Sequence, residues 1–377
     1  MIYPFLERER LFIRSLNERE NKVIFERDRI SPLQKPEKLS EAGNLLIEKT
    51  VEHILTAKEK KSSVLLTFGA HTIKNCMAPT LIELMKEGWI THLATNGAGI
   101  IHDWEIAFQG KTSEDVRANV NRGQFGIWED TGFYINLAIV VGAYENLGYG
   151  ESVGKMIVNE GLQIPEINKL YDMARQCMES DPGKAAAAID FAGAIKRFHL
   201  KAGFLSIPHP CKQYSVQAQA YNLGIPFTGH PMFGHDIIYT HPMNHGAAIG
   251  RTALNDFLRF AASVSNLDYG VYMSVGSAVM SPMIFEKALS MSQNLKIKEG
   301  KHIDNHYILV VDLAESDWDW QKKGEPPMDH PAYYLRYCKT FNRMGGEMHY
   351  LTFDNRDFLL TLCQKLNSRR RRYGRLH

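Results

Sequence analysis

The sequence lacks the cysteine patterns of a disulfide framework or a thiolate metal site. The 377 residues include only five cysteines, and no two of them form a Cys-x-x-Cys pair. An odd, scattered set of this kind is expected for free thiols in a reducing compartment. We therefore predict a cytoplasmic protein without a zinc site built from cysteines.

Long apolar runs and a strong excess of one charge are also missing. The net charge is +2 at pH 7, and residues 1–21 are rich in arginine and glutamate rather than apolar side chains. No uncharged run approaches the length of a membrane span, and no apolar N-terminal segment of the signal-peptide type is present. We expect a protein that binds neither nucleic acid nor membrane.

The composition is that of a globular protein with an ample core. Hydrophobic residues make up 44% of the chain and charged residues 23%. The length allows either two domains or one large α/β domain with an extension. We predict an N-terminal arm over residues 1–38, an α/β domain over 39–366 with a helical excursion at about 126–200, and a basic tail over 367–377.

Short apolar runs that end in small or acidic residues recur along the chain. They cover 64–68, 92–96, 203–206, 225–227, 270–279, 306–314 and 348–355, whereas residues 151–200 are predicted to be consecutive helices. Continuous apolar runs of this length are typical of strands buried on both faces of a parallel sheet. The predicted fold class is α/β, a Rossmann-like doubly wound parallel sheet with helices on both faces and a helical insertion.

The segment 92–103 is predicted to be a strand, a tight glycine-rich turn and a helix. Such a turn brings backbone N–H groups close to a ligand, although a plain strand-to-helix connection is the alternative. Together with the small and acidic residues that end the other strands, it predicts a nucleotide crevice at the carboxyl ends of the strands. The predicted cofactor-binding residues are Gly69, Asn96, Gly97, Ala98, Gly99, Gly276, Ser277, Asp312 and Asp354.

Histidines are concentrated in the segment 229–246. His230, His235, His241 and His245 surround a single aspartate, Asp236. Their spacing does not suit a metal site, so we predict no metal. Hydrogen-bonding or acid–base histidines that line a pocket are one interpretation, and histidines with a structural role are the other.

The order of these motifs resembles that of the deoxyhypusine synthase family over about residues 62–365, apart from the helical excursion. The segment 234–241 is similar to the family's Gly-Asp-Met-Ile-Tyr-Phe-His run, 96–99 to its Thr-Ala-Gly-Gly turn, and 275–279 to its Gly-Gly-Gly-Val-Val turn. The resemblance implies an NAD-dependent homotetramer, with Asp236 holding a substrate amine and Asp354 contacting the adenosine ribose.

The sequence departs from the family at several positions. A second glutamate that binds substrate in the family is replaced by His102, and a histidine pair is replaced by residues 280–282. The family's motif with the imine-forming lysine has no clean match. Lys74 and Lys339 are the candidates for that role, and an ordinary surface lysine is the alternative for each.

The function predicted from the sequence is an NAD-dependent transferase. It would oxidise a small amine, such as a polyamine, and transfer the alkyl group to another amine. Asp236 would orient the positively charged amine that donates the alkyl group, and His102, His235 or His241 would carry protons. A hydrolase or lyase that uses the same crevice, and a non-catalytic ligand-binding protein, are the alternatives.

Overall fold

The computed structural model describes residues 3–373, and the chain divides into two compact units. Unit 1 comprises Met1–Arg27, Ile100–Ala218 and Pro231–Asp256, and unit 2 comprises Asp28–Gly99, Gln219–His230 and Phe257–His377. The end of the predicted basic tail, 374–377, lies outside the described residues. None of the helices in residues 3–373 has the length and apolar character that a membrane span requires.

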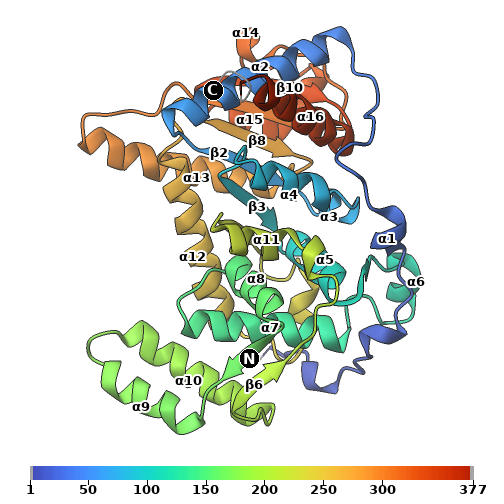
Figure 1. Cartoon of the computed structure of the whole chain (residues 1–377). Helices are drawn as coiled ribbons and strands as arrows, with labels where there is room; N and C mark the ends of the chain where they lie inside the picture. The colour runs from blue at the N-terminus through green and yellow to red at the C-terminus, as the bar shows by residue number, and fades with distance from the viewer. Residues whose placement is uncertain (1–2, 374–377) are drawn as a thin grey trace. The chain divides into compact units, whose positions relative to one another are not determined.

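Unit 2 is built on a six-stranded parallel sheet with the order β10-β9-β8-β2-β3-β7. Figure 1 labels β2, β3, β8 and β10 of this sheet. The strands are β2 (Val64–Phe68), β3 (His92–Asn96), β7 (Phe227–His230), β8 (Val271–Val275), β9 (Tyr307–Asp312) and β10 (Glu347–Thr352). β2, the first of these six strands in the sequence, thus lies in the middle, and the chain winds outward from it in both directions. This is the strand order of Rossmann folds, and it confirms the predicted fold class.

Helices cover both faces of this sheet. On one face α16 packs against α2 and α4, and on the other α13 packs against α15. The bounds are α2 (Glu41–Lys60), α3 (His71–Lys74), α4 (Ala78–Lys86), α13 (Met280–Lys298), α14 (Trp320–Lys323), α15 (Arg336–Asn342) and α16 (Asn355–Tyr373). All five residues of β2 are buried, as the continuous apolar run predicts for a central strand. On the α13 face, Tyr272, Phe285 and Phe341 form the centre of the core.

Unit 1 is mainly helical. In this unit α7 packs against α8 and α10, and α10 packs against α9. Its elements are β1 (Val23–Ile24), β4 (Lys111–Thr112), α6 (Val116–Asn121), α7 (Glu129–Tyr144), α8 (Tyr149–Asn159), β5 (Gly161–Ile164), α9 (Ile167–Cys177), α10 (Pro182–Arg197) and β6 (Gly203–Ser206). Four of the five boundaries between the units lie within helices, and the fifth follows β7. The helices are α1 (Phe25–Asp28), α5 (Gly97–Gln109), α11 (Val216–Leu223) and α12 (Gly246–Val264).

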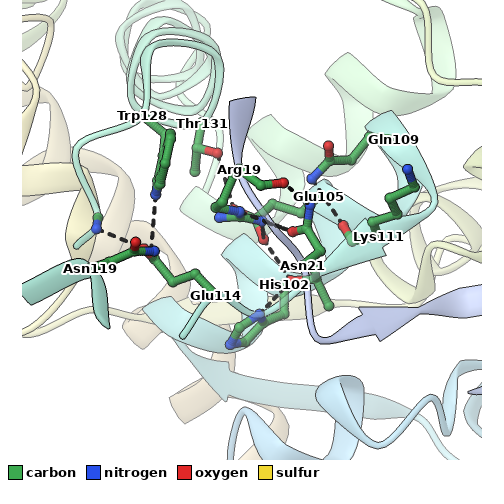
Figure 2. A network of polar contacts seen from close by, with 12 residues as sticks. Arg19, Asn21, His102, Glu105, Gln109, Lys111, Glu114, Asn119, Trp128 and Thr131 are labelled. Atoms are coloured by element: carbon green, nitrogen blue, oxygen red, sulfur yellow. Dashed lines mark hydrogen bonds and ion pairs between the residues drawn. The ribbon is translucent and has the colours of Figure 1, made fainter. Parts of the chain in front are cut away.

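The first part of the predicted arm is fixed to unit 1 by buried polar contacts. Arg19 donates to both carboxylate oxygens of Glu105 at 2.7 Å (Figure 2). Thr112 and Thr131 donate to the same carboxylate. β1 pairs with β4 in an antiparallel ladder. Residues near the start of the chain are therefore part of the structure of unit 1.

Two predictions about strands and turns are wrong. The stretch 151–200, predicted to be helical throughout, contains β5, and β6 pairs with β5 in a separate antiparallel two-stranded sheet instead of joining the parallel sheet. A four-residue strand between two helices leaves too short a pattern to detect. The predicted glycine-rich turn at 96–99 is also absent, because α5 begins at Gly97, directly after β3.

Candidate functional site

The strand order of unit 2 reverses between β2 and β8. These two strands are neighbours, but the chain leaves β2 toward α4 on one face and β8 toward α13 on the other. Gly69 and Gly276 follow the two strands directly, and the Gly69 N–H donates to the Val275 carbonyl at 3.1 Å. A Cβ atom on Gly69 would lie 2.1 Å from the Gly276 oxygen, and Gly276 has φ of +56°. Only glycine allows the two loops to approach so closely.

Amide and hydroxyl side chains gather beside these glycines. The Asn355 amide, at the start of α16, donates to Thr72 Oγ1 at 3.3 Å and accepts from Asn75 at 3.4 Å. A Cβ atom on Gly276 would lie 3.7 Å from the Asn355 nitrogen. Lys74 belongs to the same short segment, and within residues 3–373 its ammonium group has no ion-pair or hydrogen-bond partner. Lys74 was predicted from the sequence as a site residue, but Thr72, Asn75 and Asn355 were not.

The residues that follow β3 have structural contacts of their own. The Asn96 side chain accepts a hydrogen bond from the Gly99 N–H at 3.0 Å and so satisfies a donor in the first turn of α5. A Cβ atom on Gly99 would lie 2.1 Å from Thr95 Oγ1. Close packing of α5 on β3 therefore explains this glycine without a ligand. Gly97 and Ala98 lie in the same first helical turn.

Three further predicted cofactor residues also lie at the carboxyl ends of strands. Asp312 accepts from the two backbone N–H groups that follow β9, at 2.8 and 3.2 Å. Asp354 follows β10, and one of its oxygens accepts from the backbone and side chain of Arg356 at 2.8 and 3.0 Å. Ser277 Oγ accepts from the Ser281 N–H at 3.3 Å. These contacts organise the loops at this edge of the sheet.

Lys339 lies on α15 in unit 2, where its side chain is only 11% exposed. Its ammonium group is 3.5 Å from a Glu325 carboxylate oxygen and 3.9 Å from the centre of the Tyr333 ring. The charge of Lys339 therefore has partners, whereas that of Lys74 has none in the described part of the chain.

Unit 1 contains a cluster of buried oxygens without hydrogen-bond partners. They are Asp236 Oδ2, Tyr149 Oη and Tyr239 Oη. Burial raises the pKa of Asp236 to about 7, and burial together with the nearby Asp236 and Tyr239 raises the pKa of Tyr149. Because unpaired buried oxygens are costly, such a cluster is suited to a ligand that donates hydrogen bonds. Asp236 was predicted from the sequence as a site residue, but neither tyrosine was.

The predicted acid–base histidines of unit 1 differ in their surroundings. Thr112 donates its hydroxyl hydrogen to Glu105, so His102 Nδ1, 2.7 Å from that hydroxyl, carries a hydrogen. His241 lies 3.3 Å from Glu129 and accepts from the Met243 N–H at 3.0 Å. Both ring nitrogens of His241 therefore have partners. His235 is exposed.

Metal-ligating side chains do not cluster in the described part of the chain. Among residues 3–373, no group of three or more histidine, cysteine, aspartate or glutamate side chains is arranged to hold a metal ion. His230, His235, His241 and His245 therefore form no such group, although they are close in the sequence.

No protein-family model matches the sequence, and no curated protein sequence matches it. Solved structures show a distant likeness. A putative LOR/SDH protein from Methanococcus maripaludis S2 is 13% identical over 90% of this chain and 70% of that chain, with a TM-score of 0.41. ArgZ, an arginine dihydrolase from cyanobacteria, is 14% identical over 86% of this chain and 33% of its own, with a TM-score of 0.38.

AgrE in its ternary complex with ornithine and NAD+ is 12% identical over 88% of this chain and 34% of that chain, with a TM-score of 0.43. The chain thus spans about a third of the length of ArgZ and AgrE. At these identities and TM-scores, the likeness does not assign a ligand or a reaction to the chain.

Proposed function

We propose that this chain is an NAD-dependent enzyme that oxidises an amine, and that unit 2 binds the dinucleotide. The reversal of strand order between β2 and β8 is the observation that carries the proposal. In open α/β sheets, ligands bind outside the carboxyl ends of the strands at the point where the order reverses. Bound NAD supplies a hydride acceptor for the oxidation.

The residues around Gly69 and Gly276 suit a pyrophosphate group. The two glycines carry no side chains that would keep a ligand away from the backbone. Thr72, Asn75 and Asn355 supply neutral hydrogen-bonding groups, and the Lys74 ammonium supplies positive charge for phosphate oxygens. Asp312 and Asp354, at the ends of β9 and β10, are the candidates for the ribose hydroxyls.

The proposed substrate is a primary amine, held in unit 1 by Asp236, Tyr149 and Tyr239. A primary ammonium group has three N–H donors, and this cluster has three buried oxygens without partners. A nearby positive charge favours the ionised carboxylate, which opposes the effect of burial on the pKa of Asp236. The resemblance of 234–241 to the amine-binding run of deoxyhypusine synthases supports the same role.

The finer proposal is transfer of the alkyl group through a lysine. Loss of a hydride from the carbon beside nitrogen gives an iminium ion, and a lysine amine attacks that carbon while the first amine leaves. The acceptor amine then displaces the lysine, and return of the hydride completes the transfer. Lys339 is the candidate for this lysine, because we place the Lys74 ammonium at the phosphate groups; the Lys339 ammonium must first separate from Glu325 and Tyr333.

The absorbance of reduced nicotinamide tests the oxidation. With NAD+ and a panel of diamines and polyamines, we expect a transient rise for at least one amine. No rise with any of them would contradict hydride transfer and favour a hydrolase, a lyase or a non-catalytic binding protein on the same fold.

Borohydride trapping tests the transfer step. We expect a lysine-linked alkyl product in the wild type and, with saturating NAD+, in K74A, and none in K339A. A trapped product in all three proteins would show that another residue forms the imine. A product lost only in K74A would exchange the roles of the two lysines.

We also propose that the chain assembles into a homotetramer, as the family resemblance implies. Native mass spectrometry of the purified protein measures the number of subunits and reveals co-purified dinucleotide. We expect four subunits, and a protein that is monomeric at micromolar concentration would contradict this proposal.

A further inference from the structure

Four polar side chains of unit 2 form a continuous hydrogen-bonded chain across its sheet. Ser263 Oγ lies 2.8 Å from His92 Nδ1, His92 Nε2 lies 3.0 Å from Thr228 Oγ1, and Thr228 Oγ1 lies 2.9 Å from His230 Nε2. Ser263 is partly exposed, His92 and Thr228 are at most 1% exposed, and His230 is 7% exposed. This row of hydrogen-bonded side chains therefore begins near solvent and passes through the core.

The register of two neighbouring strands creates this arrangement. His92 is the first residue of β3 and His230 the last residue of β7, and Thr228 on β7 pairs with Ala94 on β3. Alternate residues of a strand share a face, so these side chains lie on one side of the sheet. The small side chain of Ala94 leaves room above it, and the Phe260 ring packs edge-on against both imidazoles.

The hydrogen positions in this chain depend on one another. The Thr228 hydroxyl has a single hydrogen and contacts two Nε2 atoms, so when it donates that hydrogen to one imidazole, the other imidazole donates to the Thr228 oxygen from Nε2. Burial lowers the pKa of both His92 and His230 to about 3, and both rings are neutral at pH 7. When each group passes a hydrogen to the next along this row of side chains, the two rings therefore change tautomer.

We propose that Ser263, His92, Thr228 and His230 form a proton relay between the amino and carboxyl edges of the sheet. His230 ends β7 beside Asn96, at the edge where we place the dinucleotide. The use of the relay rests on the proposed function, because oxidation of an amine releases a proton that must reach solvent. The existence of the relay does not depend on that function.

The outward transfer balances at every atom. His230 Nδ1 accepts a proton at the carboxyl edge, and His230 Nε2 gives its hydrogen to the Thr228 oxygen. Thr228 passes its own hydroxyl hydrogen to His92 Nε2, and His92 Nδ1 gives its hydrogen to Ser263. The Ser263 hydroxyl releases a proton to water. Every group ends uncharged, and both imidazoles have changed tautomer.

Hydrogen exchange at the His92 ring tests the relay in the free protein, without NAD or amine. His92 is fully buried, so its ring hydrogen reaches water only through Ser263 or through Thr228 and His230. In S263A we expect exchange, measured by NMR on 15N-histidine protein, to continue by the second route. In S263A/T228V we expect it to slow by roughly a hundredfold, because exchange then requires local unfolding.

The matched control is S263A/T228S, which retains a hydroxyl at position 228 and should exchange like S263A. Backbone amide exchange in the same samples shows whether a variant has loosened the fold. Equal rates in S263A and S263A/T228V, with amide exchange unchanged, would overturn the relay. So would a spectrum in which His92 and His230 have the same tautomer, or in which either is charged at pH 7.

Turnover separates the relay from the proposed function. If the protein oxidises amines, T228V should lower kcat and T228S should not, with NAD+ affinity the same in both. A normal kcat in T228V would overturn the use of the relay in catalysis. If no amine is oxidised, the proposed function fails, and the exchange rates at His92 still decide whether the relay exists.

Discussion

At the scale of single residues, the buried polar groups of unit 1 are of two kinds. Glu105 has hydrogen-bond partners for both oxygens, including the bidentate guanidinium of Arg19. Burial opposes ionisation of Glu105, but the adjacent Arg19 keeps the pKa of the carboxyl below its usual value. Asp236 Oδ2, by contrast, has no partner. The first arrangement fixes the fold, and the second is available to a ligand.

Glu105→Gln should strongly destabilise the protein. The change leaves the Arg19 guanidinium buried without a counter-charge, since its side chain is 2% exposed. Removing one partner of a buried pair typically costs about 3–5 kcal/mol. Urea unfolding measures this loss. The control is Arg175→Ala, which breaks an exposed pair with Asp172 and should cost less than about 1 kcal/mol. Equal losses in the two variants would contradict the structural role of Glu105.

Amine binding should strengthen as the pH rises toward 7. Burial raises the pKa of Asp236 from 3.8 to about 7, so the carboxyl is mostly protonated below that pH and cannot attract an ammonium group. At pH values well below the pKa of Asp236, the affinity for a diamine should fall about tenfold for each unit by which the pH is lowered. Calorimetry measures this affinity. Asp236→Asn should bind weakly at every pH. A wild-type affinity independent of pH between 5 and 7 would place the amine elsewhere.

The same carboxyl has an opposite effect on stability. Because the pKa is higher in the folded protein, Asp236 contributes stability below its unfolded pKa of 3.8, and that contribution is lost as the pH rises to about 7. The free energy of unfolding of the wild type, relative to Asp236→Asn, should therefore decrease over this range and be level above it. An increase over the same range would contradict the burial of this group.

At the scale of elements, close packing of α5 on β3 depends on Gly99. A Cβ atom there would overlap Thr95 Oγ1, which itself donates to the Phe68 carbonyl. We expect Gly99→Ala to destabilise the protein by about 1–3 kcal/mol in thermal unfolding. The matched change is Gly193→Ala on α10, where a Cβ atom has nothing within 4 Å. That variant should be more stable by about 0.5–1 kcal/mol. Two variants of equal stability would contradict the packing argument.

The strands of the parallel sheet could be predicted because each one is a short, continuous apolar run. β2 and β9 are buried along almost their whole length, which leaves a clear signal in the sequence. β5 could not be found in this way, since it is short and its Gln163 is exposed between buried Leu162 and Ile164. Local periodicity also could not reveal that β6 pairs with β5.

At the scale of the whole molecule, the sequence could predict residues at strand ends but not the partners that tertiary structure brings to them. Gly69 and Gly276 were found because each follows an apolar run. Asn355 contacts Thr72, 283 positions away in the sequence, and no local pattern connects them. Tyr149 likewise joins Asp236 only through the folding of unit 1.

The two units interrupt each other along the chain. The segment Ile100–Ala218 of unit 1 is inserted between β3 and β7, the second and third strands of the sheet of unit 2. The predicted α/β domain over 39–366, with its helical excursion at about 126–200, thus includes residues of both units. The dinucleotide site proposed here nevertheless consists entirely of residues from unit 2.

The most direct test of this account is calorimetric titration of the full chain with NAD+. The account predicts saturable binding of one dinucleotide per chain. In Lys74→Ala, binding should be weakened by roughly tenfold, as expected for loss of one charge-assisted hydrogen bond to a phosphate. The control Lys201→Ala changes an exposed lysine of unit 1 and should bind like the wild type. Absence of binding by the folded wild type, or equal affinities in all three proteins, would contradict the proposed site at Gly69 and Gly276.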